Sequence, residues 1–124
     1  MSLRPHLQPS ARHPITVSDT GRHVTVRVNG EVIAETDGAL TLRESTYPAV
    51  QYIPLSDVDS DRLRRTDTAT YCPYKGDASY YSVVTSSGVT VEDTIWTYEQ
   101  PYDAVAPIAG RVAFYSDKAQ ITVG

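Results

Sequence analysis

The residue types best suited to chemistry meet at one turn, Cys72-Pro-Tyr-Lys-Gly76. A thiolate is the nucleophilic form of cysteine, and the ammonium of Lys75, three residues away across the turn, favours that form. The glycine lets backbone amides approach a bound anion. Two interpretations are open: Cys72 is a nucleophile assisted by Lys75, or it is a small buried hydrophobe at a turn whose lysine points into water.

Aromatic residues form a second candidate group. The chain has nine tyrosines and one tryptophan but a single phenylalanine, and tyrosine and tryptophan suit surfaces that are apolar yet need a polar atom. Trp96 and Tyr98, two residues apart, share one face of a predicted strand. Together with Tyr80 they are expected to line a pocket for a flat ligand, whose anionic or carbonyl end would meet Lys75 and Gly76. The alternative is that these rings only fill the core of a sheet.

Glu44 is the third candidate, because alternation places it on the apolar face that also carries Leu40 and Leu42. A carboxylate on such a face needs a partner, for which Lys75 is a candidate, or it lines a cavity and can serve as an acid or base. The alternative is a residue at the end of a strand, already in water.

Histidine is the usual base for a cysteine nucleophile. His6 and His13 fall within residues 1–14, which show no periodicity and are predicted to form a flexible N-terminal tail. This leaves His23, on a predicted strand, as the candidate base.

The elements that must position these residues are predicted to be strands of a single β domain, residues 15–124. Turn signals at Asn29-Gly30 and Asp37-Gly38 predict two successive hairpins, and a last hairpin is predicted to turn at Asp117-Lys118. Many short strands at regular spacing favour an antiparallel sandwich or open barrel. The alternating segments are Arg22–Val28, Glu31–Thr36, Ala39–Ser45, Val50–Leu55, Asp77–Thr85, Val89–Glu99, Arg111–Ser116 and Ala119–Val123.

One segment departs from the strand pattern. Ser56–Asp67 carries acids early and arginines late, which suits the dipole of a helix. Val58 and Leu63 are its only large apolar residues. The pattern therefore predicts one short surface helix, or a structured loop.

Composition limits the classes of partner. The formal net charge of -4 and the pI of about 5.2 argue against nucleic acid as a partner. No apolar run is long enough to cross a membrane and residues 1–14 hold no secretory signal, so we expect a cytoplasmic protein that binds no membrane. A lone Cys72 excludes an internal disulfide and a thiolate zinc site, and we expect no metal and no cofactor. The expected partner is an unidentified small molecule; a homo-oligomer is also possible.

The motifs, taken in order, span nearly the whole chain. With them the sequence resembles the family called domain of unknown function 427, a group of small bacterial and fungal proteins. The matching stretches are His13-Pro-Ile-Thr-Val17, Tyr52-Ile-Pro54 with Asp57-Val58, Thr70–Tyr81, Trp96-x-Tyr98 with Pro101, and Gly110–Tyr115.

This resemblance implies the β-tent fold of the Mss4-like group: all-β and antiparallel, with two short twisted sheets packed at an angle and at most one or two short helices. Some members of that group hold zinc through paired Cys-x-x-Cys motifs, which this sequence lacks. Others bind small cyclic amides in a cage of tryptophans, bind RNA ends, or reduce methionine sulfoxide. A nucleotidyltransferase label is attached to the family, but the chain has no Gly-Ser followed by paired aspartates.

The leading functional hypothesis is a domain that binds a flat polar small molecule in an aromatic-lined pocket beside the Cys72–Gly76 turn. Three alternatives remain: an enzyme that uses Cys72 as nucleophile with Lys75 and Glu44, the nucleotidyltransferase activity of the family label, and a protein-interaction module. Whether the protein is an enzyme is left open.

Overall fold

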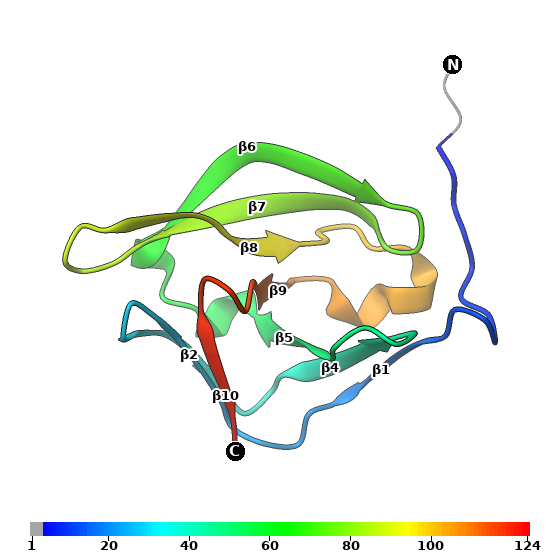
Figure 1. Ribbon diagram of the computed structural model, residues 1–124, viewed down its shortest axis with the longest axis horizontal. Helices are drawn as coiled ribbons and strands as arrows, with labels where there is room; N and C mark the ends of the chain where they lie inside the picture. The colour runs from blue at the N-terminus through cyan, green and yellow to red at the C-terminus, as the bar shows by residue number, and fades with distance from the viewer. Residues whose placement is uncertain (1–3) are drawn as a thin grey trace.

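The computed structural model describes residues 4–124, and this part of the chain is built from β-strands joined by loops and short 3-10 turns (Figure 1). The all-β prediction is confirmed. The elements are, in order, β1 (Ile15–Asp19), β2 (Val24–Val28), β3 (Glu31–Thr36), β4 (Leu40–Glu44), β5 (Val50–Pro54), η1 (Leu55–Asp57), η2 (Ser60–Arg62), β6 (Leu63–Cys72), β7 (Gly76–Val84), β8 (Thr90–Thr97), η3 (Asp103–Ile108), β9 (Arg111–Phe114) and β10 (Gln120–Val123).

The strands form two antiparallel sheets. The large sheet has the order β1-β4-β5-β9-β8-β7-β6, and the small sheet has the order β10-β2-β3. In Figure 1, β6, β7 and β8 cross the top of the molecule while β5, β4 and β1 lie below, with β9 between them. The short strand β9 therefore joins the two parts of the large sheet, β1-β4-β5 on one side and β8-β7-β6 on the other.

Strands of the large sheet bury apolar side chains on both of their faces. Alternate residues of one strand enter different cores: in β5, Ile53 packs into the core against the small sheet, whereas Tyr52 packs into a second core. Val105 and Ile108 of η3 belong to that second core. Burial on both faces holds the large sheet between two apolar layers, and the second layer is rich in tyrosine.

The hairpin predicted at Asn29-Gly30 is confirmed. β2 and β3 pair through it, and φ is 50° at Asn29 and 80° at Gly30. Positive φ at both central residues gives a two-residue turn whose twist matches that of the flanking strands.

The second predicted hairpin, at Asp37-Gly38, is wrong, and so is the continuous three-stranded unit that it implied. β3 belongs to the small sheet and β4 to the large one. The hydroxyl of Thr36 accepts from the Gly38 amide at 2.9 Å and donates to Asp57 at 2.6 Å. These two hydrogen bonds fix the bend in the conformation that takes the chain from the small sheet to the large one.

Of the two alternatives for Ser56–Asp67, the helix is wrong, and the structured loop holds only as far as Arg62. The segment forms the turns η1 and η2 and then enters β6. The Asp59 side chain caps η2 by accepting from the Asp61 amide at 3.1 Å, and Val58 is buried beside Ala34, with which it forms a β-bridge. Two apolar residues are too few to build a helix face. Arg64 and Arg65, which follow, are exposed residues of β6.

The last predicted hairpin does not form either. β9 pairs with β5 and β8, whereas β10 pairs with β2 of the small sheet. A turn closed by the amides of Lys118 and Ala119 on the carbonyl of Tyr115 carries the chain between the sheets.

Residues 4–14 run along the body of the protein (Figure 1). Arg4 pairs with Asp77, and the amide of Leu7 donates to the carbonyl of Pro73 at 3.0 Å. The flexibility predicted for residues 1–14 stays a prediction, and residues 1–3 lie outside the described part.

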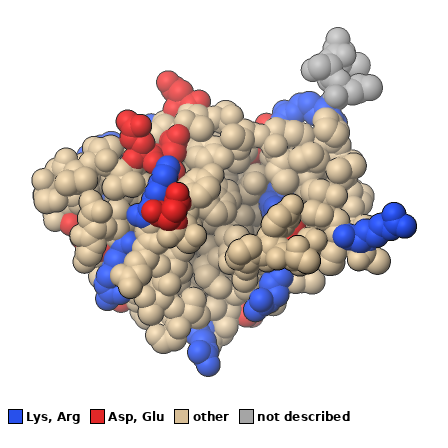
Figure 2. Space-filling view, in the orientation of Figure 1, with Lys and Arg blue, Asp and Glu red and all other residues tan. Residues whose placement is uncertain are grey.

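Figure 2 shows charged side chains in small separate groups on one face, with broad uncharged surface between them. None of the helices within residues 4–124 has the length and hydropathy needed to cross a membrane.

Candidate functional site

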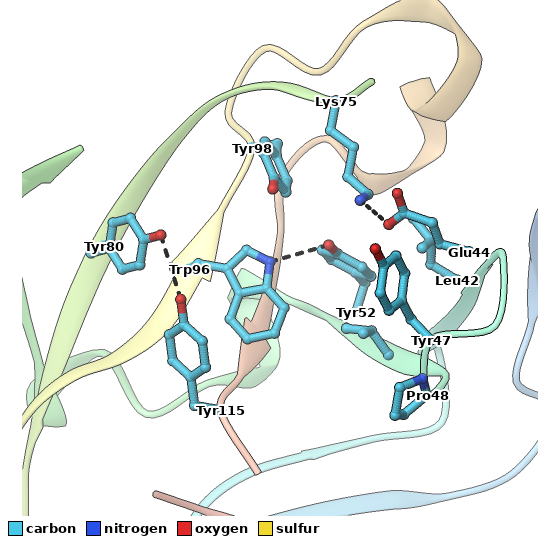
Figure 3. Close-up of a pocket in the computed structure, with 11 residues that line it drawn as sticks. Leu42, Glu44, Tyr47, Pro48, Tyr52, Lys75, Tyr80, Trp96, Tyr98 and Tyr115 are labelled. Atoms are coloured by element: carbon cyan, nitrogen blue, oxygen red, sulfur yellow. Dashed lines mark hydrogen bonds and ion pairs between the residues drawn. The ribbon is translucent and has the colours of Figure 1, made fainter. Parts of the chain in front are cut away.

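A cavity of about 220 Å³ lies on the tyrosine-rich face of the large sheet (Figure 3). Strands β4, β5, β7 and β8 contribute its walls, and the loop between β4 and β5 contributes Tyr47 and Pro48, both exposed. The residues around it are Leu42, Glu44, Tyr47, Pro48, Val50, Tyr52, Lys75, Tyr80, Trp96, Tyr98 and Tyr115.

One end of the cavity is charged. The Nζ of Lys75 donates to Oε1 of Glu44, and Nε2 of His13 lies 2.7 Å from Oε2 of the same carboxylate. The Lys75 and Glu44 side chains are 9% and 15% exposed, and His13 stacks on Tyr74 with ring centroids 4.1 Å apart. Both oxygens of the carboxylate are therefore occupied, while the ammonium keeps donors for another group.

The state of Glu44 follows from these two partners. Burial on its own would raise the pKa of Glu44, but the hydrogen bonds from Lys75 and His13 outweigh it and hold the pKa below its ordinary value. Glu44 is therefore ionised at neutral pH and acts as the counterion of a buried lysine.

Lys75 is placed by the tight turn between β6 and β7. Its amide donates to the Cys72 carbonyl at 3.2 Å, and its carbonyl accepts from the Tyr102 amide at 3.0 Å. Gly76 has φ of 109°, and a Cβ there would lie 3.4 Å from the carbonyl oxygen of Gln100. The glycine at this position is therefore required by the backbone, and it allows the 100–102 loop to pack against the turn.

Aromatic side chains make the opposite wall. The indole Nε1 of Trp96 donates to the Tyr52 hydroxyl at 3.3 Å, and the Trp96 and Tyr115 rings are tilted with centroids 4.5 Å apart. The Tyr80 hydroxyl bonds to Thr70 at 2.9 Å and accepts from Tyr115 at 3.4 Å. Packing and hydrogen bonds hold the indole ring in place at the edge of the cavity.

The tyrosine hydroxyls are donors at neutral pH. Burial raises the pKa of Tyr52 and of Tyr98 well above the ordinary value, and burial together with a bond to Tyr80 does the same for Tyr115. Each therefore keeps its proton throughout the physiological range.

Tyr98 differs from the other buried tyrosines of the cavity. The residue is 8% exposed, yet no hydrogen bond within residues 4–124 occupies its hydroxyl. In Figure 3 this hydroxyl points toward Trp96, into the space that Lys75 borders. The hydroxyl is not one of the fully buried atoms of the described residues that lack a partner, so it is open to the cavity and free to bind a group that enters it.

The structure brings together five of the residues singled out from the sequence. Glu44, Lys75, Tyr80, Trp96 and Tyr98 all line the cavity. The pairing of Glu44 with Lys75, one of the partners considered for it, is present.

Cys72 and Gly76 do not line this cavity. Cys72 ends β6, is partly buried and packs against the second core, and Gly76 sets the turn that presents Lys75. The nucleophilic role of Cys72 stays a prediction, and alkylation of the folded protein against a denatured control tests it.

The choice of His23 as the candidate base is corrected by the geometry. His23 is on the surface, where its ring bonds to Asp37 at 2.8 Å and Glu35 at 3.3 Å. The histidine next to the cavity is His13, which bonds to Glu44 although its position in residues 1–14 predicted a flexible tail. The sequence feature that could have identified His13 is its position two residues before Ile15, the first residue of β1, which pairs with Glu44.

Sequence reasoning also passed over Tyr52, Tyr47 and Val50. Val50 and Tyr52 sit two residues apart on β5, so they share a face, and β5 pairs with β4 through Leu42 and Leu40. The alternation of Val50 and Tyr52 can be seen in the sequence, whereas the pairing of β5 with β4 is known only from the structure.

Within the described residues, no three His, Cys, Asp or Glu side chains are grouped as ligands of a metal ion. The arrangement therefore offers hydrogen-bond donors, one ammonium with its counterion, and a stacking surface.

Fold and site together define an all-β domain with one aromatic-lined cavity that ends in a buried ion pair. A family model described as a domain of unknown function, DUF427, matches residues 16–124, so the chain belongs to that family. The identification made from the sequence is confirmed. No curated protein sequence matched the chain.

Proposed function

We propose that this domain binds a small, flat, polar molecule in the cavity, with its ring against Trp96 and its carbonyl or carboxylate oxygen toward Lys75 and Tyr98. The observation that carries the proposal is the Tyr98 hydroxyl, which has no hydrogen-bond partner within residues 4–124 and is open to the cavity that Lys75 and Trp96 also line. A ligand oxygen supplies the missing partner, and the surrounding low dielectric strengthens that bond.

The size of the cavity limits the ligand. A volume of about 220 Å³ corresponds to roughly seven water molecules at about 30 Å³ each. This suits a molecule of one or two rings.

The polar groups limit its chemistry. Lys75, Tyr52 and Tyr98 offer protons, and both oxygens of Glu44 are already engaged. These groups favour a ligand that presents acceptors, and a nucleobase, a cyclic amide or an aromatic carboxylate fits. Some Mss4-like proteins also bind cyclic amides. The proposal includes two further points: the chain belongs to the Mss4-like group, and the protein is located in the cytoplasm.

A thermal-shift screen of nucleobases, nucleotides, cyclic amides and aromatic carboxylates tests it. Ligands that bind the folded state raise the melting temperature. Trp96→Ala is expected to abolish the shift given by any hit, whereas Tyr81→Ala, which removes a ring from the other face of the same sheet, is expected to retain it. Stabilisation that persists in Trp96→Ala would contradict the proposed pocket.

A further inference from the structure

A second cavity, of about 470 Å³, adjoins the first. Five residues line both: Tyr47, Pro48, Val50, Trp96 and Tyr115. The shared walls are the β4–β5 loop on one side and the Trp96 and Tyr115 rings on the other. The two cavities are therefore neighbours with shared walls, and together they are called the groove.

The second cavity lies where β9 separates from β5. β9 pairs with β5 only through Val112 and Arg111, so Val50 and Gln51 have β4 as a partner on one side and no ladder partner from β9 on the other. Past Phe114 the chain turns away to β10 in the small sheet. The groove opens between β5 and β10 where the large sheet is not continued.

The lining of the second cavity is mostly apolar. Phe114, which is buried, and Ile121, which is partly buried, lie on its inner side, Val123 lies at its exposed edge, and Gln51 and Ser116 are polar members of its wall. Val123 is 40% exposed and Tyr47 is 64% exposed. The groove thus changes in character along its length, from a charged and hydroxyl-rich end at Lys75 to an apolar end at Val123.

We propose that the ligand has two parts: the flat polar head described above, and an aliphatic or aryl substituent of the same molecule that lies in the second cavity. This inference rests on the proposed function. The walls that the two cavities share at Trp96 and Tyr115 support it, because a head seated against these rings has Phe114 and Ile121 on their other side as neighbours for its substituent. A free nucleobase in the first cavity would leave the larger second cavity, of about 470 Å³, empty.

A series of benzoates tests the inference: benzoate and its 4-ethyl, 4-butyl and 4-hexyl derivatives. Dissociation constants are measured by titration followed in two-dimensional amide and indole NMR spectra. Affinity is expected to rise with each methylene, by up to about fourfold if each is fully buried, and the longer members are expected to shift the amide signals of Phe114, Ile121 and Val123.

Val123→Asp places a charge in the apolar part and is expected to abolish the gain with chain length while leaving the affinity for benzoate unchanged. Val32 offers a matched control, because it is equally exposed at 40% and lies outside both cavities. Val32→Asp is expected to keep the full gain. Circular dichroism of both variants verifies that they fold.

The outcomes separate this inference from the proposed function. If benzoate binds at Trp96 but affinity does not grow with chain length, or if it grows equally in Val123→Asp, the two-part ligand is wrong and the head site stands. If no member of the series shifts the Trp96 indole signal, the head site fails for aromatic carboxylates and the two-part ligand fails with it. If Val123→Asp instead abolishes self-association measured by analytical ultracentrifugation, a second copy of the chain covers the groove and the inference is overturned.

Discussion

At the scale of single residues, Lys75 is the side chain least expected where it lies. Lysine is seldom buried without a partner, and here its side chain is 9% exposed beside a cavity. A buried ion pair adds little net stability, because desolvation of both charges offsets their attraction. The Lys75–Glu44 pair is therefore better explained by the ammonium group that it presents to the cavity than by its contribution to the stability of the fold.

Glu44→Gln is expected to lower the free energy of unfolding at pH 7 by about 1–2 kcal/mol, because it leaves the Lys75 ammonium without a counterion. The effect should depend on pH. The folded-state pKa of Glu44 is lowered, so its contribution is present above the unfolded-state pKa and is lost as pH falls through the folded-state pKa.

Urea unfolding at several pH values between 7 and 3 measures this dependence. The difference between wild type and Glu44→Gln is expected to shrink as the pH falls, since a protonated Glu44 resembles glutamine. The exposed Glu92 gives the control, and Glu92→Gln should follow the wild type. A difference that stays constant down to pH 3 would contradict the role assigned to Glu44.

Gly76→Ala is expected to destabilise the fold by about 1–3 kcal/mol, because φ of 109° is unfavourable for a residue with a side chain. Gly38→Ala is the matched control. Gly38 has no positive φ, and a Cβ there would be 3.6 Å from the Thr36 hydroxyl, an ordinary contact. Equal midpoints of urea denaturation for the two variants would show that the turn does not need its glycine.

At the scale of elements, alternation in the sequence located most of the strands but missed β1 and the start of β6, and it did not identify which strands pair. The Asn29-Gly30 hairpin was predictable because its turn chemistry demands positive φ at two residues. Asp37-Gly38 carries nearly the same local signal, yet its flanking strands belong to different sheets, since Thr36 and Asp57 hold the bend open. Pairing between distant segments, such as β9 with β5 or β10 with β2, leaves no local signature.

The N-terminal segment is an element of the site even though residues 4–14 contain no strand. His13 holds Glu44, and the carbonyl of Pro14 accepts from the Ser45 amide at 2.8 Å. Nearer the start, His6 stacks on Tyr102 with centroids 3.7 Å apart. The segment thus connects the end of β4 with the loop that packs on the Lys75 turn.

His13→Ala is expected to cost about 1–2 kcal/mol of stability, because the hydrogen bond it removes ends on a partly buried carboxylate. Arg4→Ala removes an exposed ion pair with Asp77 and is expected to cost less than His13→Ala. Thermal unfolding of the two variants measures the contrast. A larger loss from Arg4→Ala than from His13→Ala would contradict the account of this segment.

At the scale of the whole molecule, the site depends on a sheet that is apolar on both faces. One face packs on the small sheet, and the other carries the tyrosine-rich core from which the cavity opens. The members of the site come from β4, β5, β7, β8 and the turn before β7, which only the complete sheet brings together. The sequence could therefore nominate Trp96, Tyr98 and Lys75 by type, but could not supply Tyr52 or His13, whose roles depend on the order of the strands.

The central claim is that this cavity binds a flat polar ligand, and the side chain of Trp96 tests it most directly. The protein has one tryptophan, so its NMR spectrum contains one indole N–H signal, which in the free protein donates to Tyr52. Titration with the best hit of the thermal-shift screen is expected to move this signal to a saturating limit, together with the Lys75 and Tyr98 amides. If the hit stabilises the protein while the indole signal stays in place, the ligand binds elsewhere and the claim is wrong.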